Sequence, residues 1–307
     1  MALAGQDFTE KQLLVLAFDH RGSFMEKLFG IKGRPPTAQE TAEISDYKKA
    51  VYEGFLKAVE NGVPKNIAGI LVDEQFGAAI AQDARNNHIT FAMPCEKSGQ
   101  DEFDFEYSEE FGEHVRKFSP SYCKVLVRYN SGAGAQANAG QLQKLGQLND
   151  WLSQNNTPFL FELLVPATKQ QLDSVQGDKT KYDSQLRPKL MVQAMREIQA
   201  AGVEPDVWKM EGVDADVDAS AIVAQAQEEG RKSGVITLGR GESREKVAEW
   251  LKVGARIPGI IGFAVGRTIF WDALAGMKQG KHSREQAVEA IARNYREFVE
   301  LWQAEKS

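Results

Sequence analysis

The sequence has few cysteines and no long hydrophobic run. Its two cysteines are Cys95 and Cys123, which in a chain of intracellular character we expect to be reduced packing residues, not a disulfide or a metal cage. No apolar run approaches the ~20 residues that a membrane-spanning helix needs, and residues 1–12 lack the charged-then-apolar layout of a signal peptide. These absences predict a soluble, cytoplasmic protein.

Charge of one sign is also scarce. The 37 basic and 43 acidic residues give a net charge of −6, without a long block of like charge. This balance argues against nucleic acids and membrane surfaces as partners, so an anionic ligand needs a local basic site. The four histidines are scattered, with no His-x-x-x-His spacing, and a zinc site is therefore poorly supported.

What the sequence does contain is an alternation of two patterns. Short apolar, β-rich runs alternate with stretches of 3.6-residue periodicity, and no Pro/Gly/Ser-rich linker interrupts them. The runs are apolar on both faces, as buried parallel strands are. The eight predicted strands are Leu13–Phe18, Ile67–Val72, Ile89–Met93, Tyr122–Tyr129, Phe159–Leu164, Val207–Met210, Val235–Leu238 and Ile260–Val265.

Helical patterns separate and follow these runs, and two begin with capping-box spacing, at Thr37–Glu40 and Ser283–Gln286. The predicted helices are Thr41–Glu60, Glu109–Phe118, Gln141–Gln154, Gln185–Ala200, Ala219–Glu229, Arg244–Val253, Thr268–Met277 and Arg284–Trp302. Eight strands with such helices predict an α/β fold, a single-domain (β/α)8 TIM barrel over residues 1–307. A doubly wound open sheet is the alternative, but Asp19–Gly22 is not the glycine fingerprint expected there.

Polar residues gather where the predicted strands end. These ends form the active-site face of a (β/α)8 barrel, and alternate side chains of each strand point into the barrel. By that alternation Asp19, Lys124, Arg128, Glu162 and Lys209 fall on faces that can point inward. The pattern predicts a ring of charge in the barrel mouth.

Lys209 has two interpretations. A lysine inside so apolar a strand must be paired or used, because an unpaired buried charge is costly. It can form a structural ion pair with Glu162 or Glu211, or it can be a Schiff-base lysine. In the second case the attacking amine must be neutral, a state that burial and a nearby cation such as Lys124 favour. Glu162 would then move protons.

The last two strands lead into glycine–arginine turns, at Gly239–Gly241 and at Gly266–Arg267. Glycines let backbone N–H groups approach an anion, helix N-termini add positive potential, and Arg240 or Arg267 can bind phosphate oxygens. Barrel enzymes often hold phosphate at this place. Two ordinary turns with solvated arginines are the alternative. His20, at the end of the first strand, is a candidate substrate contact.

Six stretches in order along the chain carry a resemblance: Leu16–Phe24, Ile70–Gly77, Cys123–Tyr129, Phe159–Leu163, Asp206–Glu211 and Gly262–Phe270. With them the chain resembles class I aldolases related to tagatose 1,6-bisphosphate aldolase and sulfofructose-phosphate aldolase. It looks most like the aldolase domain, of the DUF2090 type, that is fused to 5-dehydro-2-deoxygluconokinase. One departure is Gly212, where the inositol-pathway domains carry a proline.

The resemblance implies a TIM-barrel aldolase that uses no metal and no cofactor. Lys209 matches its Schiff-base lysine, Glu162 its general acid/base and Lys124 its second active-site lysine. Asp19 matches an acid that contacts substrate hydroxyls. The segment of Arg267 matches a phosphate site, and Arg240 lies in the other glycine-rich loop.

The resemblance further implies cleavage of a phosphorylated keto sugar or keto-deoxy sugar acid to dihydroxyacetone phosphate and an aldehyde. The favoured substrate is 2-deoxy-5-keto-gluconate 6-phosphate. The alternative is tagatose or fructose 1,6-bisphosphate, because a second phosphate needs only one more basic contact, from Arg21, Lys97 or Arg128. A homo-oligomer is compatible with the sequence.

Two hypotheses of another kind remain at this stage. A metal-dependent barrel lyase could use Asp19, His20, Asp73 and Glu96. A barrel without catalysis could sense a sugar phosphate, although a sensor has no need of both lysines together with Glu162.

Overall fold

Eight parallel strands close into a barrel in the computed structural model, which describes residues 6–306. The strands are β1 (Leu13–Ala17), β2 (Ala68–Leu71), β3 (Thr90–Pro94), β4 (Tyr122–Arg128), β5 (Phe159–Leu164), β6 (Val207–Glu211), β7 (Gly234–Leu238) and β8 (Ile260–Val265). Each pairs with the next, and β8 pairs with β1. The predicted (β/α)8 TIM barrel is confirmed, and the open sheet is not what forms.

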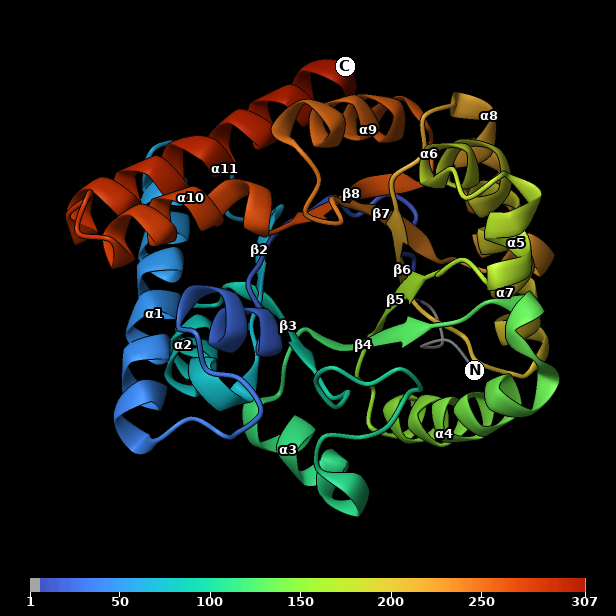
Figure 1. Cartoon of the computed structure of the whole chain (residues 1–307), viewed down its shortest axis with the longest axis horizontal. Helices are drawn as coiled ribbons and strands as arrows, with labels where there is room; N and C mark the ends of the chain where they lie inside the picture. Colours follow the sequence, from blue (N-terminus) through green and yellow to red (C-terminus); the bar gives the residue numbers. More distant parts are fainter. Residues whose placement is uncertain (1–5, 307) are drawn as a thin grey trace.

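Helices surround the barrel as an outer ring (Figure 1). They are α1 (Ala38–Glu60), α2 (Glu74–Asn86), α3 (Phe111–Phe118), α4 (Ala135–Gln154), α5 (Lys169–Ser174), α6 (Lys179–Lys181), α7 (Arg187–Ala200), α8 (Asp216–Ala226), α9 (Arg244–Arg256), α10 (Arg267–Lys278) and α11 (Arg284–Lys306). The short 3-10 and π-helices are η1 (Phe24–Leu28), η2 (Ser108–Glu110), η3 (Ser131–Ala133), η4 (Tyr182–Leu186) and η5 (Glu228–Gly230). In Figure 1, α11 lies along α1 and closes the ring. No helix within residues 6–306 is long and apolar enough to cross a membrane.

Both predicted capping boxes form. Thr37 Oγ1 accepts from the Glu40 backbone N–H at 3.2 Å, and the Glu40 carboxylate accepts from the Thr37 N–H at 2.7 Å. Ser283 and Gln286 exchange the equivalent pair at 3.2 and 2.8 Å. These bonds satisfy backbone donors that a helix start otherwise leaves free. They start α1 at Ala38, three residues before the predicted Thr41.

Three helices are missing from the sequence prediction, namely α2 and the short α5 and α6. The segment Glu74–Asn86 forms α2, with Asp73 as its N-cap, accepting from the Phe76 N–H at 2.9 Å. Much of its buried face is glycine and alanine, at Gly77, Ala81 and Ala84. Phe76 and Ile80 complete that face, so the segment does carry a 3.6-residue period, which the prediction missed.

The barrel interior is filled with side chains, as predicted from strand alternation. Leu13, Val15 and Ala17 of β1 belong to an inner apolar cluster that is separate from the larger cluster between strands and helices. Phe8, which precedes β1, joins the inner cluster and packs edge-on against Tyr122, with ring centroids 6.2 Å apart. Asp19, Lys124, Glu162 and Lys209 each follow a residue of this inner cluster by two positions, and Arg128 continues the row of Lys124. The two cysteines are free and buried.

The closure of the barrel depends on a glycine. Gly262 of β8 pairs with Leu13 of β1, and a Cβ atom at Gly262 would lie 1.8 Å from the Leu13 carbonyl oxygen. The two backbones therefore approach more closely than any other residue allows.

We expect the Gly262→Ala substitution to lower the free energy of unfolding by about 3 kcal/mol, because backbone cannot move aside as a flexible side chain can. The control is Gly146→Ala in α4, where an added Cβ meets nothing within 4 Å, and where alanine should add up to about 1 kcal/mol. Urea unfolding measures both. Equal midpoints for the two variants would contradict this account of the closure.

Candidate active site

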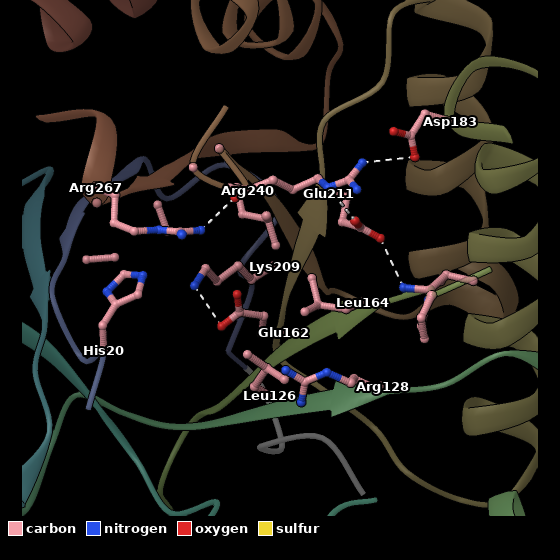
Figure 2. A pocket seen from close by; sticks show the side chains of 18 of the residues that line it. His20, Leu126, Arg128, Glu162, Leu164, Asp183, Lys209, Glu211, Arg240 and Arg267 are labelled. Carbon is pink, nitrogen blue, oxygen red and sulfur yellow. Dashed lines mark hydrogen bonds and ion pairs between the residues drawn. The ribbon is translucent and has the colours of Figure 1, made fainter. Parts of the chain in front are cut away.

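A cavity of about 600 Å³ opens at the carboxyl ends of the strands. Its floor includes Ala17, Leu126 and Ala264, which come from β1, β4 and β8. Figure 2 shows Lys209 and Glu162 pointing toward each other there, with His20 and Arg267 to one side. The cavity therefore lies where a (β/α)8 barrel carries its chemistry.

Two lysines share one carboxylate in this mouth. Glu162 Oε2 lies 2.7 Å from Lys209 Nζ and 3.0 Å from Lys124 Nζ. The three residues come from the neighbouring strands β4, β5 and β6, where Leu126 pairs with Glu162 and Glu162 pairs with Lys209. The structure therefore brings together the three residues predicted for imine chemistry.

Lys124 is the most enclosed member of the group. Its side chain is 1% exposed, and its Nζ also contacts Asp19 and Glu96, each at 2.8 Å. Burial lowers the pKa of Lys124, but Asp19, Glu162 and Glu96 raise it well above its usual range. This lysine is therefore a permanent ammonium that holds three carboxylates from three strand ends.

The carboxylates respond to that ammonium. Burial raises the pKa of Glu162, but the charges of Lys124 and Lys209 lower it by more. The same two lysines, against the same effect of burial, hold the pKa of Asp19 far below its usual range. Burial keeps the pKa of Glu96 raised despite Lys124 and Arg21. Glu162 and Asp19 are therefore ionised at neutral pH and can accept a proton or a hydroxyl hydrogen bond.

His20 lines the same cavity. Its ring packs edge-on against Phe270, with centroids 6.0 Å apart, and its buried Nδ1 has no partner. Burial lowers the pKa of His20 to about 4, with help from Arg267 and Lys209 and against Asp19. The imidazole is therefore neutral at physiological pH, with one ring nitrogen available to a ligand.

The two glycine–arginine turns lie side by side at the cavity rim. Arg267, the first residue of α10, donates from Nη2 to the Arg240 carbonyl oxygen at 2.7 Å. A Cβ atom at Gly241, whose φ is 77°, would lie 2.3 Å from the Arg267 guanidinium. A Cβ at Gly266 would lie 2.1 Å from the Ala17 carbonyl oxygen. Glycine at both places therefore sets the position of Arg267.

The two predicted phosphate arginines differ in their partners. Arg240 is paired with Glu211 at 3.1 Å and with Asp183 at 2.9 Å. Gly239, which precedes it, also lines the cavity. Within residues 6–306 no carboxylate is paired with Arg267. An arginine without a counter-charge at a helix N-terminus is a ready anion site, so Arg267 is the stronger candidate of the two.

Three other residues were predicted as anion contacts. Lys97 is exposed in the segment after β3, and the other two, Arg21 and Arg128, differ in their partners. Arg21 donates to Glu106 and to the Glu96 carbonyl oxygen, each at 2.8 Å, and so clamps the segment that follows β3. Arg128, at the end of β4, lines the cavity and donates to the Gln100 carbonyl oxygen at 2.5 Å. The charge of Arg21 is therefore compensated by the Glu106 carboxylate, whereas no carboxylate of the described residues is paired with Arg128.

Some lining residues were not foreseen. The segment after β5 supplies Lys179, Tyr182 and Asp183, and Asp183 also accepts from Arg187 at 2.9 Å. The sequence signal was the unusual length of polar chain between the fifth and sixth strands. Glu96 was considered only as a metal ligand, but it is a partner of Lys124.

The four residues of the metal hypothesis do not come together. Asp73 caps α2 and forms a fully buried ion pair with Lys48, away from the lining of the cavity. Asp19 and Glu96 both contact the Lys124 ammonium instead. Within the described part of the chain, no group of three or more histidine, cysteine, aspartate or glutamate side chains is arranged to hold a metal ion.

Solved structures share the architecture at low sequence identity. The fructose-bisphosphate aldolase of Plasmodium falciparum, solved with TRAP and a small-molecule inhibitor, aligns with a TM-score of 0.65 and 13% identity, over 97% of this chain and 93% of that one. Cgl0159 of Corynebacterium glutamicum aligns with a TM-score of 0.56 and 17% identity, over 96% of this chain and 88% of that one. The fructose-bisphosphate aldolase of Slackia heliotrinireducens aligns with a TM-score of 0.55 and 15% identity, over 92% of this chain and 86% of that one. At such identities the likeness establishes the class of fold, a (β/α)8 barrel.

The family is established by sequence. Residues 4–306 match the model of DUF2090, described as an uncharacterized protein conserved in bacteria. The chain belongs to this family. No curated protein matches it.

We expect Lys124→Met to lower the free energy of unfolding by about 3–5 kcal/mol at pH 7, because it leaves buried carboxylates without their cation. In the wild type the lowered pKa values of Asp19 and Glu162 stabilise the fold above about pH 4, and this stabilisation is lost as the pH falls further. In the variant these pKa values rise, so the two carboxylates bind protons as the pH falls from 7 to 4.5. The loss of unfolding free energy relative to the wild type should therefore be smaller at pH 4.5 than at pH 7.

Urea unfolding at the two pH values measures the deficit. The control is Lys144→Met, which breaks an exposed pair with Asp104 and should cost under about 1 kcal/mol at either pH. A deficit for Lys124→Met that is independent of pH would count against the role given to its charge.

Proposed function

We propose that the protein is a class I aldolase that forms an imine between Lys209 and the ketone of a phosphorylated sugar. The observation that carries the proposal is the position of Lys209 Nζ. It is almost fully buried at the cavity floor, 2.7 Å from a carboxylate that a second lysine also contacts, and the cavity it faces also contains the uncompensated Arg267.

Imine formation requires Lys209 to lose a proton and attack the carbonyl carbon. Glu162 Oε2 is the carboxylate within reach of that proton. As the amine loses its charge, Glu162 loses one of the two cations that keep it ionised, so its affinity for the proton rises at the same step. The carbinolamine then loses its hydroxyl as water, with Glu162 returning the proton, and the iminium remains.

Carbon–carbon cleavage follows from the same groups. A base removes the proton of the hydroxyl group that is β to the imine carbon. The bond between the α and β carbons breaks, its electron pair moves to the iminium, and an aldehyde is released. Glu162 is the base, Lys124 keeps its charge throughout, and Asp19 accepts hydrogen bonds from substrate hydroxyls. Protonation of the enamine and hydrolysis return the free lysine and the ketone product.

The phosphate of the ketone half binds at the two glycine–arginine turns. Arg267 supplies the guanidinium, and the N-terminus of α10, whose N-cap Gly266 has no side-chain cap, supplies backbone donors. Arg240, held by Glu211 and Asp183, shapes the adjoining wall. His20, neutral and with a free nitrogen, contacts the substrate near the carbonyl group.

The favoured substrate is 2-deoxy-5-keto-gluconate 6-phosphate, cleaved to dihydroxyacetone phosphate and a three-carbon aldehyde acid. The resemblance of the sequence to the inositol-pathway aldolase domains supports this choice. Fructose or tagatose 1,6-bisphosphate is the second candidate, supported by the names of two of the structural neighbours. A sensor without catalysis would have no need of a buried carboxylate that two lysines share at the cavity floor.

Incubation with dihydroxyacetone phosphate followed by borohydride should attach the three-carbon phosphate to Lys209, because reduction converts the imine into a stable amine. Peptide mass spectrometry locates the adduct. The Lys209→Met variant should fold normally, form no adduct and lose turnover by several orders of magnitude, as removal of a covalent nucleophile does. An adduct found only at another lysine would overturn the assignment of Lys209.

Turnover should survive removal of metal ions, because the protonated imine accepts the electron pair that a Lewis acid would otherwise stabilise. The test is extended dialysis against EDTA, followed by assay with and without added divalent metal. Activity that is lost on dialysis and restored by metal would favour the metal-dependent lyase.

A further inference from the structure

A second, smaller cavity adjoins the first. Its volume is about 210 Å³, and Lys209, Glu162, His20 and Arg128 line both cavities. The remainder of its wall comes from β4, from the residues that follow β1 and from the segment that follows β3. Lys209 therefore borders both spaces, and Arg267 lines only the larger one, whereas Arg128 lines both.

The smaller cavity contains a concentration of unsatisfied polar atoms. Nine buried side-chain polar atoms of the described residues have no hydrogen-bond partner. Four of the nine belong to residues that line this cavity, namely His20 Nδ1, Arg21 Nε, Glu96 Oε2 and Gln100 Nε2. Because buried polar groups are nearly always paired in folded proteins, such a group of exceptions in one small space indicates a polar ligand.

Gln100 offers a donor with a defined orientation. Its Oε1 accepts from the Asp104 backbone N–H at 2.6 Å, so the amide oxygen is engaged and the NH₂ end is the one left free. The segment that carries it is tied down by a bridge between Glu96 and Phe105 and by a bond from the Lys97 N–H to the Asp104 carbonyl oxygen. The free donor is therefore held in place before any ligand arrives.

Arg128 offers charge at the same end. One of its nitrogens donates to the Gln100 carbonyl oxygen at 2.5 Å, and no carboxylate within residues 6–306 is paired with it. Asp19, Glu96 and Glu162, the acids that line this cavity, all contact the Lys124 ammonium and are not paired with Arg128. The end of the cavity near Arg128 and Gln100 therefore carries donors and positive charge without compensation.

We propose that Arg128 and the Gln100 amide form a second anion subsite, which selects substrates whose aldehyde half ends in a carboxylate or a phosphate. The proposal rests on the proposed function. With the phosphate of the ketone half at Arg267 and the carbonyl carbon at Lys209, the aldehyde half extends into the smaller cavity. Carboxylate and phosphate share the chemistry that a guanidinium and an amide donor recognise. Both residues determine specificity and take no part in bond breaking.

The test runs the reaction in the direction of condensation, with dihydroxyacetone phosphate held constant and three aldehydes compared. Freshly prepared 3-oxopropanoate carries a carboxylate, glyceraldehyde 3-phosphate carries a phosphate, and glyceraldehyde is neutral. We expect kcat/KM for at least one anionic aldehyde to exceed that for glyceraldehyde by about 30-fold or more, the scale of a charged hydrogen-bonded contact. The preferred anion identifies which of the two classes the subsite accepts.

Variants assign that preference to residues. Arg128→Leu should lower kcat/KM for the preferred anionic aldehyde by about 10- to 100-fold and change that for glyceraldehyde by less than about 3-fold. Gln100→Leu should act in the same direction by about 5-fold, and it carries the test if Arg128→Leu fails to fold. The control is Arg196→Leu, which removes an exposed arginine of α7 outside both cavities and should alter none of the three values.

The outcomes separate the two proposals. An adduct at Lys209 together with equal use of all three aldehydes overturns the subsite and leaves the aldolase standing. Equal losses for charged and neutral aldehydes in the Arg128 or Gln100 variant also overturn it, because selection of charge is what is proposed. Absence of any adduct in the wild type overturns the proposed function and the subsite with it.

Discussion

The mouth of the barrel depends on one buried ammonium. Lys124 lies among three carboxylates that come from the ends of different strands, and each contact is 3.0 Å or shorter. Without that charge, the carboxylates would repel one another or bind protons in a space that water hardly reaches. With it, Asp19 and Glu162 stay ionised. The Glu162 oxygen that contacts Lys124 also contacts Lys209. The geometry around the proposed nucleophile therefore follows from a lysine that does not itself react.

Charge compensation also sorts the arginines of the mouth into two kinds. Arg21 and Arg240 are paired with carboxylates and hold the surrounding segments in place. Arg128 and Arg267 have only backbone carbonyl partners among the described residues. The two kinds are indistinguishable in the sequence, since all four follow or end strands. Only the folded structure reveals which of them still has charge to offer a ligand.

Much of the fold could be read from the sequence because buried parallel strands are apolar on both faces. The predicted strands agree with the observed ones to within one residue at each end, and the inward alternation placed Lys209, Glu162 and Lys124 correctly. The prediction missed α2, although its buried residues Phe76, Gly77, Ile80, Ala81 and Ala84 recur with a helical period. It named Glu96 only as a metal ligand and did not identify Gln100, because the loop after β3 has no periodicity and is shaped by backbone contacts within the segment.

The packed base of the barrel restricts the route by which substrate and products enter and leave. Phe8 and Tyr122 belong to the inner apolar cluster, which fills the barrel below the charged mouth. Both cavities lie on the opposite side of that cluster, at the carboxyl ends of the strands. A molecule bound over Lys209 must then leave by the face through which it came. If a bond is cut there, the two fragments share one exit. In the proposed mechanism the fragment attached to Lys209 departs second, because the aldehyde is released before the enamine is hydrolysed.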